Sequence, residues 1–152
     1  MSARAAEELP GAVLFACTLN SVRSPMASAI LRHLSANQVY AKSAGARRGE
    51  PDAFAIAAMD EIGIDISRHV PVAISELHDT SFDLIITLSP EAHHQALELT
   101  RAMDVQVEFW PTADPTATGG KREQILEAYR ACRDQLFDRI KTRFALSAGA
   151  SV

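Results

Sequence analysis

The stretch Cys17-Thr18-Leu19-Asn20-Ser21-Val22-Arg23-Ser24-Pro25 decides the fold. The apolar residues 13–16 before it are typical of a buried strand, and Ser24 and Pro25 open a helical pattern that continues to Ala36. The segment therefore predicts a strand, a tight loop and a helix in that order. In such a loop, successive backbone N–H groups and a helix N-terminus point at one spot, which favours binding of phosphate and formation of a thiolate.

Two side chains of this loop can supply chemistry. Cys17 is a candidate nucleophile, and Arg23 offers two parallel N–H donors that suit two oxygens of a tetrahedral anion. The candidate substrate-binding residues are Thr18, Leu19, Asn20, Ser21, Val22, Arg23 and Ser24. A single cysteine at the end of a strand is more often a structural core residue than a nucleophile, so the downstream sequence has to support the assignment.

Length and composition indicate a globular protein. The chain has 152 residues, 47% hydrophobic and 22% charged, with a net charge of −4. We expect one domain over residues 11–145 with flexible termini at residues 1–10 and 146–152. The acidic balance argues against a nucleic-acid-binding face, and no apolar run approaches membrane-spanning length. Because a reactive thiol needs a reducing compartment and no secretion signal opens the sequence, we expect a cytoplasmic protein without nucleic-acid or membrane partners.

Strand and helix patterns alternate along the chain. The predicted elements after the first helix are a short strand at 38–42, a loop at 43–49, a helix at 51–62 closed by Gly63, a strand at 82–88, a helix from Ser89 and Pro90 to about Met103, a strand at 105–109, a loop at 110–120 and a last helix at 121–144. This alternation predicts an α/β fold, a parallel sheet covered by helices on both faces. Ligands of such sheets bind at the carboxyl ends of strands, so we expect the Cys17 loop and the 110–120 loop to meet.

Other polar side chains have structural interpretations. Cys132 belongs to an apolar stripe of the last helix, which indicates core packing. His93 and His94 are adjacent on a helix and are interpreted as solvated. Arg47 and Arg48 are either a plain surface pair or the rim of a cleft that attracts anionic substrates. No Cys/His cluster has zinc spacing, so neither a metal nor another cofactor is predicted.

The Cys17 loop and several later motifs together resemble the low-molecular-weight protein tyrosine phosphatases and the related thioredoxin-coupled arsenate reductases. The motifs occur in family order over roughly residues 13–144: the loop followed by Met26-Ala27, then Lys42-Ser43-Ala44-Gly45, Gly63-Ile64-Asp65-Ile66-Ser67-Arg68-His69, Phe82-Asp83-Leu84-Ile85-Ile86-Thr87-Leu88 and Asp114-Pro115. The resemblance implies a flavodoxin-like architecture, with a four-stranded parallel sheet flanked by helices on both faces.

The resemblance also implies roles for single residues. Cys17 matches the nucleophile, Arg23 the phosphate clamp and Asp114 the general acid. Ser24 matches the hydroxyl that hydrogen-bonds the thiolate. The residues that match support of the loop's shape are Asn20, Ser24, Ser43 and His69. Taken alone, Asp114 before Pro115 would be interpreted as a turn initiator.

Several positions depart from the family pattern. Thr116-Ala117 and Ala46-Arg47-Arg48 stand where the tyrosine phosphatases carry aromatic residues, which argues against strong phosphotyrosine specificity. Leu19 stands where a glycine is usual, and the loss of glycine's conformational freedom bears on the loop's activity. Ser89 and Ala96 stand where the reductases carry their two further redox cysteines.

These residues predict a cysteine-dependent phosphatase that hydrolyses phosphate monoesters through a phosphocysteine intermediate, without a cofactor. The expected partners are a phosphorylated protein or a small phosphate ester, with inorganic phosphate or arsenate as ligand. One alternative is an arsenate reductase in which an external small thiol resolves Cys17. A second is a phosphate- or oxyanion-binding regulatory module with poor turnover. Turnover that is lost on Cys17→Ser would separate an enzyme from a binding module.

Overall fold

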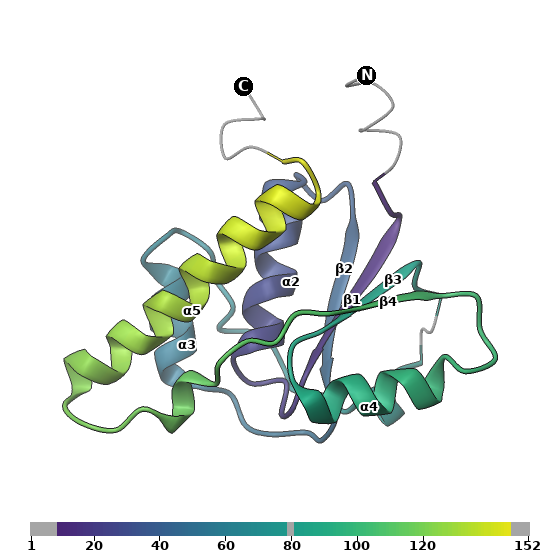
Figure 1. Ribbon diagram of the computed structural model, residues 1–152. Coiled ribbons are helices and arrows are strands. Elements are labelled where there is room, and N and C mark those ends of the chain that lie inside the picture. Colours follow the sequence, from purple (N-terminus) through teal and green to yellow (C-terminus); the bar gives the residue numbers. More distant parts are fainter. Residues whose placement is uncertain (1–8, 79–80, 147–152) are drawn as a thin grey trace.

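The computed structural model describes residues 9–78 and 81–146 (Figure 1). The described residues form one four-stranded parallel sheet in the order β2-β1-β3-β4. The elements are β1 (Ala12–Cys17), α2 (Arg23–Leu34), β2 (Tyr40–Gly45), α3 (Ala53–Asp60), the 3-10 turn η1 (Ile74–Glu76), β3 (Leu84–Thr87), α4 (Pro90–Leu99), β4 (Gln106–Phe109), the 3-10 turn η2 (Pro115–Ala117) and α5 (Arg122–Arg143). The predicted α/β fold with a parallel sheet is confirmed.

Helices cover both faces of this sheet. Figure 1 shows α2, α3 and α5 on one face and α4 on the other. Within β1, Val13 and Phe15 pack toward α2 and α5, whereas Leu14 and Ala16 pack toward α4. Alternate residues of a strand point to opposite faces, so a strand covered on both sides reads as a continuous apolar run. That is why residues 13–16 could be predicted as a strand.

The strand order places a ligand crevice at the end of β1. The chain passes from β1 to β2 on one side and later to β3 on the other, so the winding direction changes at β1. Ligands of doubly wound sheets bind at the carboxyl ends of the strands at such a switch point. Cys17 is the last residue of β1 and therefore lies in this crevice.

The second strand lies further along the chain than predicted. Ala36 and Asn37 adopt left-handed backbone conformations, with φ of 52° and 62°, and the turn that they form delays β2 until Tyr40. The strand then continues through Ser43 to Gly45, pairing with the last residues of β1. The prediction of a loop from Ser43 was wrong, because β2 has to extend as far as β1 to complete the ladder.

All four helices are somewhat shorter than predicted, and α3 and α4 differ most. The Asp52 side chain accepts hydrogen bonds from the N–H groups of Phe54 and Ala55, so α3 starts at Ala53 rather than at Pro51. α4 ends at Leu99 instead of Met103. Most of the termini predicted to be flexible, residues 1–8 and 147–152, lies outside the described residues, and the domain limits stay a prediction.

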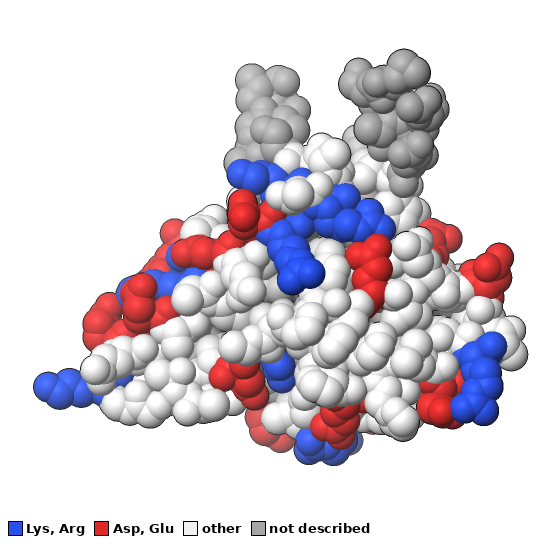
Figure 2. Space-filling view, viewed as in Figure 1, with Lys and Arg blue, Asp and Glu red and all other residues white. Residues whose placement is uncertain are grey.

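The surface carries charges of both signs. Figure 2 shows Lys and Arg side chains interspersed with Asp and Glu on the face in view. No helix in residues 9–78 and 81–146 is long and apolar enough to span a bilayer.

Candidate active site

The backbone of the Cys17 loop turns its carbonyl groups away from the crevice. The carbonyls of residues 17, 18 and 19 accept hydrogen bonds of 2.8, 2.8 and 2.9 Å from N–H groups of the bracing segment, residues 46–49. In a trans peptide, the C=O of one residue and the N–H of the next point in opposite directions, and the described chain has no cis peptide bond. The N–H groups of residues 18–20 therefore face the crevice, where they can bind an anion.

Two glycines permit this close approach of backbones. A Cβ on Gly45 would lie 2.5 Å from the Arg47 carbonyl oxygen and 2.8 Å from the Asn20 nitrogen. A Cβ on Gly49 would lie 2.8 Å from the Cβ of Leu19. A side chain at either glycine would push the bracing segment off the loop. The sequence predicted a loop that contains both glycines, but it did not predict that this loop hydrogen-bonds the Cys17 loop.

Cys17 sits at the focus of the loop and is 2% exposed. Its Sγ lies 2.9 Å from Ser24 Oγ and accepts a 3.4 Å hydrogen bond from the Ser24 N–H. Val22, at the N-cap of α2, has no side-chain acceptor for the first N–H groups of the helix. The sulfur therefore takes the place of a helix cap at the positive end of the helix dipole.

Asn20 orients the Ser24 hydroxyl behind the sulfur. It is fully buried, its Oδ1 accepts from the Val72 N–H at 3.0 Å, and its Nδ2 donates to Ser24 Oγ at 2.8 Å. Because Nδ2 occupies one lone pair of Ser24 Oγ, the hydroxyl proton can be donated to Cys17 Sγ, with the Ala44 carbonyl 3.3 Å away as the other acceptor. The contacts fit the support roles implied for Asn20 and Ser24.

The left-handed residue of the loop is Asn20, with φ of 59°, and Leu19 has an ordinary negative φ. Asparagine adopts this conformation more readily than other non-glycine residues. Position 19 therefore does not use the left-handed conformation that favours glycine. The effect of Leu19 on the loop's activity stays a prediction.

Arg23 links the Cys17 loop to the loop after β4. The guanidinium is buried, its Nη1 donates to the Thr112 carbonyl at 2.9 Å and its Nη2 donates to Thr18 Oγ1 at 3.3 Å. Nη2 also lies 3.7 Å from Asp114 Oδ2. The predicted meeting of the two loops is therefore observed. Thr112 was missed by the sequence analysis because it contributes a backbone carbonyl, which any residue type provides.

Asp114 has one oxygen engaged in a turn and one directed to the crevice. Oδ1 accepts hydrogen bonds from the Thr116 N–H at 3.0 Å and from Thr116 Oγ1 at 2.7 Å. Oδ2 is the oxygen near Arg23, and the side chain is 44% exposed. The turn-initiating role and a role in proton transfer are thus compatible, because they use different oxygens.

These groups line one small pocket of about 50 Å³. Pockets for drug-sized molecules measure roughly 300–1,000 Å³, so this one suits a small ion or the phosphoryl end of a larger molecule. The lining residues are Cys17, Thr18, Leu19, Ser21, Val22, Arg23, Asp114 and Thr116. Asn20 and Ser24 lie behind this lining. Residues 9–78 and 81–146 contain no group of three or more His, Cys, Asp or Glu side chains that could hold a metal ion.

The other two proposed support residues differ in their contacts. His69 Nε2 lies 3.0 Å from the Asn20 carbonyl oxygen, so His69 contacts the loop directly. Ser43 lies within β2, paired with Phe15, and the hydrogen bonds found in the described part of the chain do not connect its hydroxyl to the loop. The support role of Ser43 stays a prediction without a direct contact.

Because His69 is partly buried, we expect its protonation to change the free energy of unfolding of the protein with pH. Burial lowers the pKa of His69, the charges of Arg32 and Lys42 lower it further, and the hydrogen bond to Asn20 opposes them. Below the ordinary pKa of about 6.5, the unfolded chain binds a proton that the folded chain resists, so stability should fall as the pH falls through this range. The loss should level off below the folded-state pKa.

The measurement is urea unfolding of the native protein and of His69→Gln at about pH 7.5 and about pH 5.5. The glutamine amide can still donate to Asn20 but does not titrate, so part of the acid destabilisation should disappear. His94→Gln, at an exposed position, is the control. An unchanged pH dependence in His69→Gln would show that His69 does not carry the effect.

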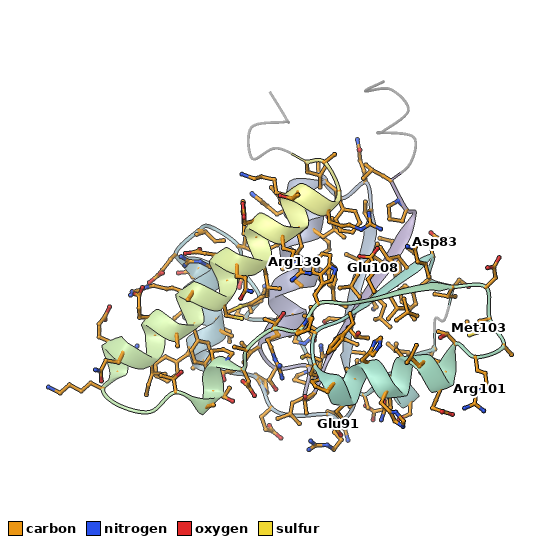
Figure 3. All side chains as sticks on the ribbon, viewed as in Figure 1. Asp83, Glu91, Arg101, Met103, Glu108 and Arg139 are labelled. Carbon is orange, nitrogen blue, oxygen red and sulfur yellow. The ribbon has the colours of Figure 1, made fainter. Side chains whose placement is uncertain are left out.

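The two arginines of the bracing segment both have carboxylate partners. Arg47 pairs with Glu91 at 3.0 Å, and Arg48 Nη1 lies 3.4 Å from Glu76 Oε2. Figure 3 shows Glu91 at the start of α4. Of the two interpretations left open, these pairs favour surface ion pairs, because a nearby carboxylate weakens the attraction of each arginine for anions.

The prediction that His93 is solvated was wrong. His93 is half-buried, its Nδ1 lies 2.9 Å from Thr87 Oγ1, and its ring stacks on Phe109 with centroids 4.5 Å apart. Adjacency to His94 could not reveal this, because the contact depends on β4 directing Phe109 toward α4.

The aromatic ring nearest in sequence to Asp114 is held away from the pocket. Trp110 is 5% exposed, packs edge-on against Phe15 and lies 4.9 Å beneath the Arg139 guanidinium. Its Nε1 donates to Glu108. Figure 3 shows Arg139 on α5 and Glu108 on β4, the residues of these two elements that contact the indole. The indole is therefore part of the α5 packing.

Comparisons with known proteins agree on the family and the fold. The family model described as low molecular weight phosphotyrosine protein phosphatase matches residues 12–146. A glutaredoxin arsenate reductase from Synechocystis sp. is 31% identical over 134 residues, covering 88% of this chain and 95% of the relative.

Two solved structures are similar over nearly the whole chain. An arsenate reductase in its phosphate-binding state has a TM-score of 0.68 and 29% identity, covering 88% of this chain and 96% of the other. A low molecular weight protein tyrosine phosphatase from T. tengcongensis has a TM-score of 0.74 and 24% identity, covering 88% and 97%. The second likeness concerns the fold alone. The similar proteins thus include both a reductase and a phosphatase.

Proposed function

Because the chain belongs to the low molecular weight phosphotyrosine protein phosphatase family, we propose that it hydrolyses phosphate monoesters through a phosphocysteine intermediate. The family is one of enzymes and includes phosphatases and arsenate reductases. The observation that carries the proposal is the carboxyl group of Asp114, which lines the same small pocket as the Cys17 sulfur and the Arg23 guanidinium. Ester hydrolysis needs such a proton donor, since an alkoxide or phenoxide has to leave.

In the first chemical step, the Cys17 thiolate attacks phosphorus. A sulfur–phosphorus bond forms, the bond from phosphorus to the ester oxygen breaks, and the protonated Asp114 gives its proton to that oxygen. The N–H groups of residues 18–20 and the guanidinium of Arg23 meet the charge on the three other oxygens.

In the second step, the Asp114 carboxylate removes a proton from a water molecule that attacks the phosphocysteine. The sulfur–phosphorus bond breaks, inorganic phosphate leaves, and the Cys17 thiolate returns. The Ser24 hydroxyl, 2.9 Å from Sγ, stabilises that thiolate as the leaving group.

An arsenate reductase that uses an external small thiol is the second candidate function. The 31% identity to a protein named glutaredoxin arsenate reductase favours it, and arsenate has the shape and charge of phosphate. Reduction of arsenate takes two electrons from thiols, however, and a second thiol has to release the oxidised or adducted Cys17. Among the described residues, Cys132 is the other cysteine.

The positions that match the further cysteines of the reductases do not supply that second thiol, and neither does Cys132. Ser89 is 2% exposed, and its hydroxyl caps α4 by accepting the Ala92 N–H. Ala96 is 1% exposed and lies on the buried face of α4. Burial raises the pKa of Cys132 to about 12, so its thiol is a poor nucleophile near neutral pH.

We therefore expect that arsenate, thioredoxin, thioredoxin reductase and NADPH together give no NADPH oxidation above background. The same protein should release phosphate from an aryl phosphate in a parallel assay. Replacing thioredoxin by glutaredoxin and glutathione tests the second candidate, and turnover there would make it the better description. Thioredoxin-dependent oxidation that disappears in Cys132→Ser would contradict the assignment of Cys132 to the core.

A further inference from the structure

Leu19 is the exposed apolar residue of the catalytic pocket. It is 39% exposed, whereas its loop neighbours Asn20 and Val22 are 0% and 4% exposed. Its carbonyl is held by the Gly49 N–H at 2.9 Å, so the backbone at this position is fixed. The side chain therefore extends from a rigid loop at a defined place in the pocket lining.

Gly49 makes room for this side chain. A Cβ on Gly49 would lie 2.8 Å from Leu19 Cβ and 2.7 Å from Ser21 Oγ, closer than real Cβ atoms approach. The absence of a side chain at Gly49 thus lets Leu19 and Ser21 pack over the bracing segment. Leu19 keeps a large exposed area although the loop around it is closely packed.

The rest of the lining explains what Leu19 can contact. In the described chain, the residues that line the pocket include no aromatic ring. Opposite the loop stand Asp114 and Thr116, whose hydroxyl already donates to Asp114. A bare phosphate or arsenate ion is bound by the N–H groups and by Arg23, and it presents no apolar surface to a leucine.

We propose, on the basis of the phosphatase function above, that Leu19 binds the leaving group of the substrate. The site then takes phosphate esters whose leaving group has an apolar surface next to the ester oxygen. Such an ester gains affinity over inorganic phosphate or arsenate by covering Leu19. Burial of apolar surface contributes roughly fourfold in affinity for each methylene removed from water.

The test is calorimetric titration with inorganic phosphate, methylphosphonate and butylphosphonate. Phosphonates keep the phosphoryl group but have a carbon–phosphorus bond, so binding is measured without turnover. The native protein should bind butylphosphonate more tightly than methylphosphonate. This gain should disappear in Leu19→Ala and persist in Leu19→Met, while the dissociation constant for phosphate stays unchanged in both variants.

Leu97→Ala is the matched control, because Leu97 is 49% exposed on α4 and lies outside the pocket lining. Leu97→Ala should bind butylphosphonate more tightly than methylphosphonate by the same factor as the native protein. A gain that survives in Leu19→Ala would overturn the proposal, since another group would then bind the alkyl chain. Weaker phosphate binding in Leu19→Ala would also overturn it, because Leu19 would then support the loop.

The experiment separates this inference from the phosphatase function. The protein could bind butylphosphonate more tightly through Leu19 and yet release no phosphate from esters. That result would contradict the proposed hydrolysis but confirm Leu19 as a binding contact. The protein could instead hydrolyse esters and bind butylphosphonate no more tightly than methylphosphonate. That result would support the phosphatase function and contradict the proposed role of Leu19.

Discussion

Replacing Cys17 by serine is expected to lower phosphate-ester hydrolysis by about 10⁴–10⁶-fold. The serine hydroxyl is far less acidic than a thiol and a poorer leaving group from phosphorus, so both chemical steps suffer. Binding of inorganic phosphate should be retained, because the N–H groups of residues 18–20 and the Arg23 guanidinium remain in place. The measurements are steady-state turnover and calorimetric phosphate binding on the same preparation.

The chain offers its own control in Cys132→Ser. Cys132 is buried on α5 and lies outside the pocket lining, so this variant should keep native turnover. Acid quenching of the native enzyme during turnover, followed by mass spectrometry, should find the phosphoryl group on Cys17. Full activity in Cys17→Ser would exclude the cysteine as nucleophile. Phosphate binding without any turnover in the native protein would favour the oxyanion-binding module.

The sequence correctly predicted the strand–loop–helix order around Cys17, because the side-chain types that indicate it occur at fixed spacing. Cys17, Arg23 and Ser24 come from one strand–loop–helix unit, and no distant contact is needed to place them together. Apolar residues before and helix-forming residues after the loop set its position. Local signals of this kind survive in a single sequence.

The parts of the site that were missed depend on backbone groups. The Thr112 carbonyl holds Arg23, and the N–H groups of the bracing segment hold the carbonyls of the loop. Every residue other than proline carries both groups, so such contacts leave almost no trace in residue type. Among these residues, only Gly45 and Gly49 indicate in the sequence where the bracing segment packs on the Cys17 loop, because a side chain at either position would prevent the contact.

The misplaced start of β2 has a different cause. The turn before it uses left-handed conformations at Ala36 and Asn37, and alanine gives no sign of such a conformation. The extent of β2 is set instead by its partner β1, a tertiary effect that overrides local preference. As a result, Ser43 belongs to a strand rather than to the loop in which the sequence placed it.

Asp114→Asn is expected to slow esters with poor leaving groups by about 10²–10⁴-fold. An alkyl phosphate cannot release its alkoxide without a proton, whereas p-nitrophenolate leaves unaided. The rate of the first step should therefore fall much less for p-nitrophenyl phosphate. The amide oxygen of asparagine can still accept the hydrogen bonds of Thr116. The turn is therefore kept, and the variant tests proton transfer alone.

Two further results distinguish the acid from a turn residue. The carboxylate lies 3.7 Å from Arg23, and removing its negative charge should not weaken phosphate binding, since an anion is repelled by it. Because Asp114 would also activate the attacking water, Asp114→Asn should accumulate phosphocysteine with p-nitrophenyl phosphate. Rapid quenching with mass spectrometry measures that species directly.

The control is Asp104→Asn, an exposed aspartate outside the pocket lining, which should behave as the native enzyme. A pH–rate profile completes the test, because the limb that arises from the Asp114 carboxyl should be absent in the variant. Asp114→Asn could instead lower turnover by the same small factor for good and poor leaving groups, with no phosphocysteine accumulation. That result would show that Asp114 forms the turn and is not the general acid. The proton for the leaving oxygen would then have to come from solvent, because Thr116, the residue of η2 that lines the pocket, carries a hydroxyl too weakly acidic for this role.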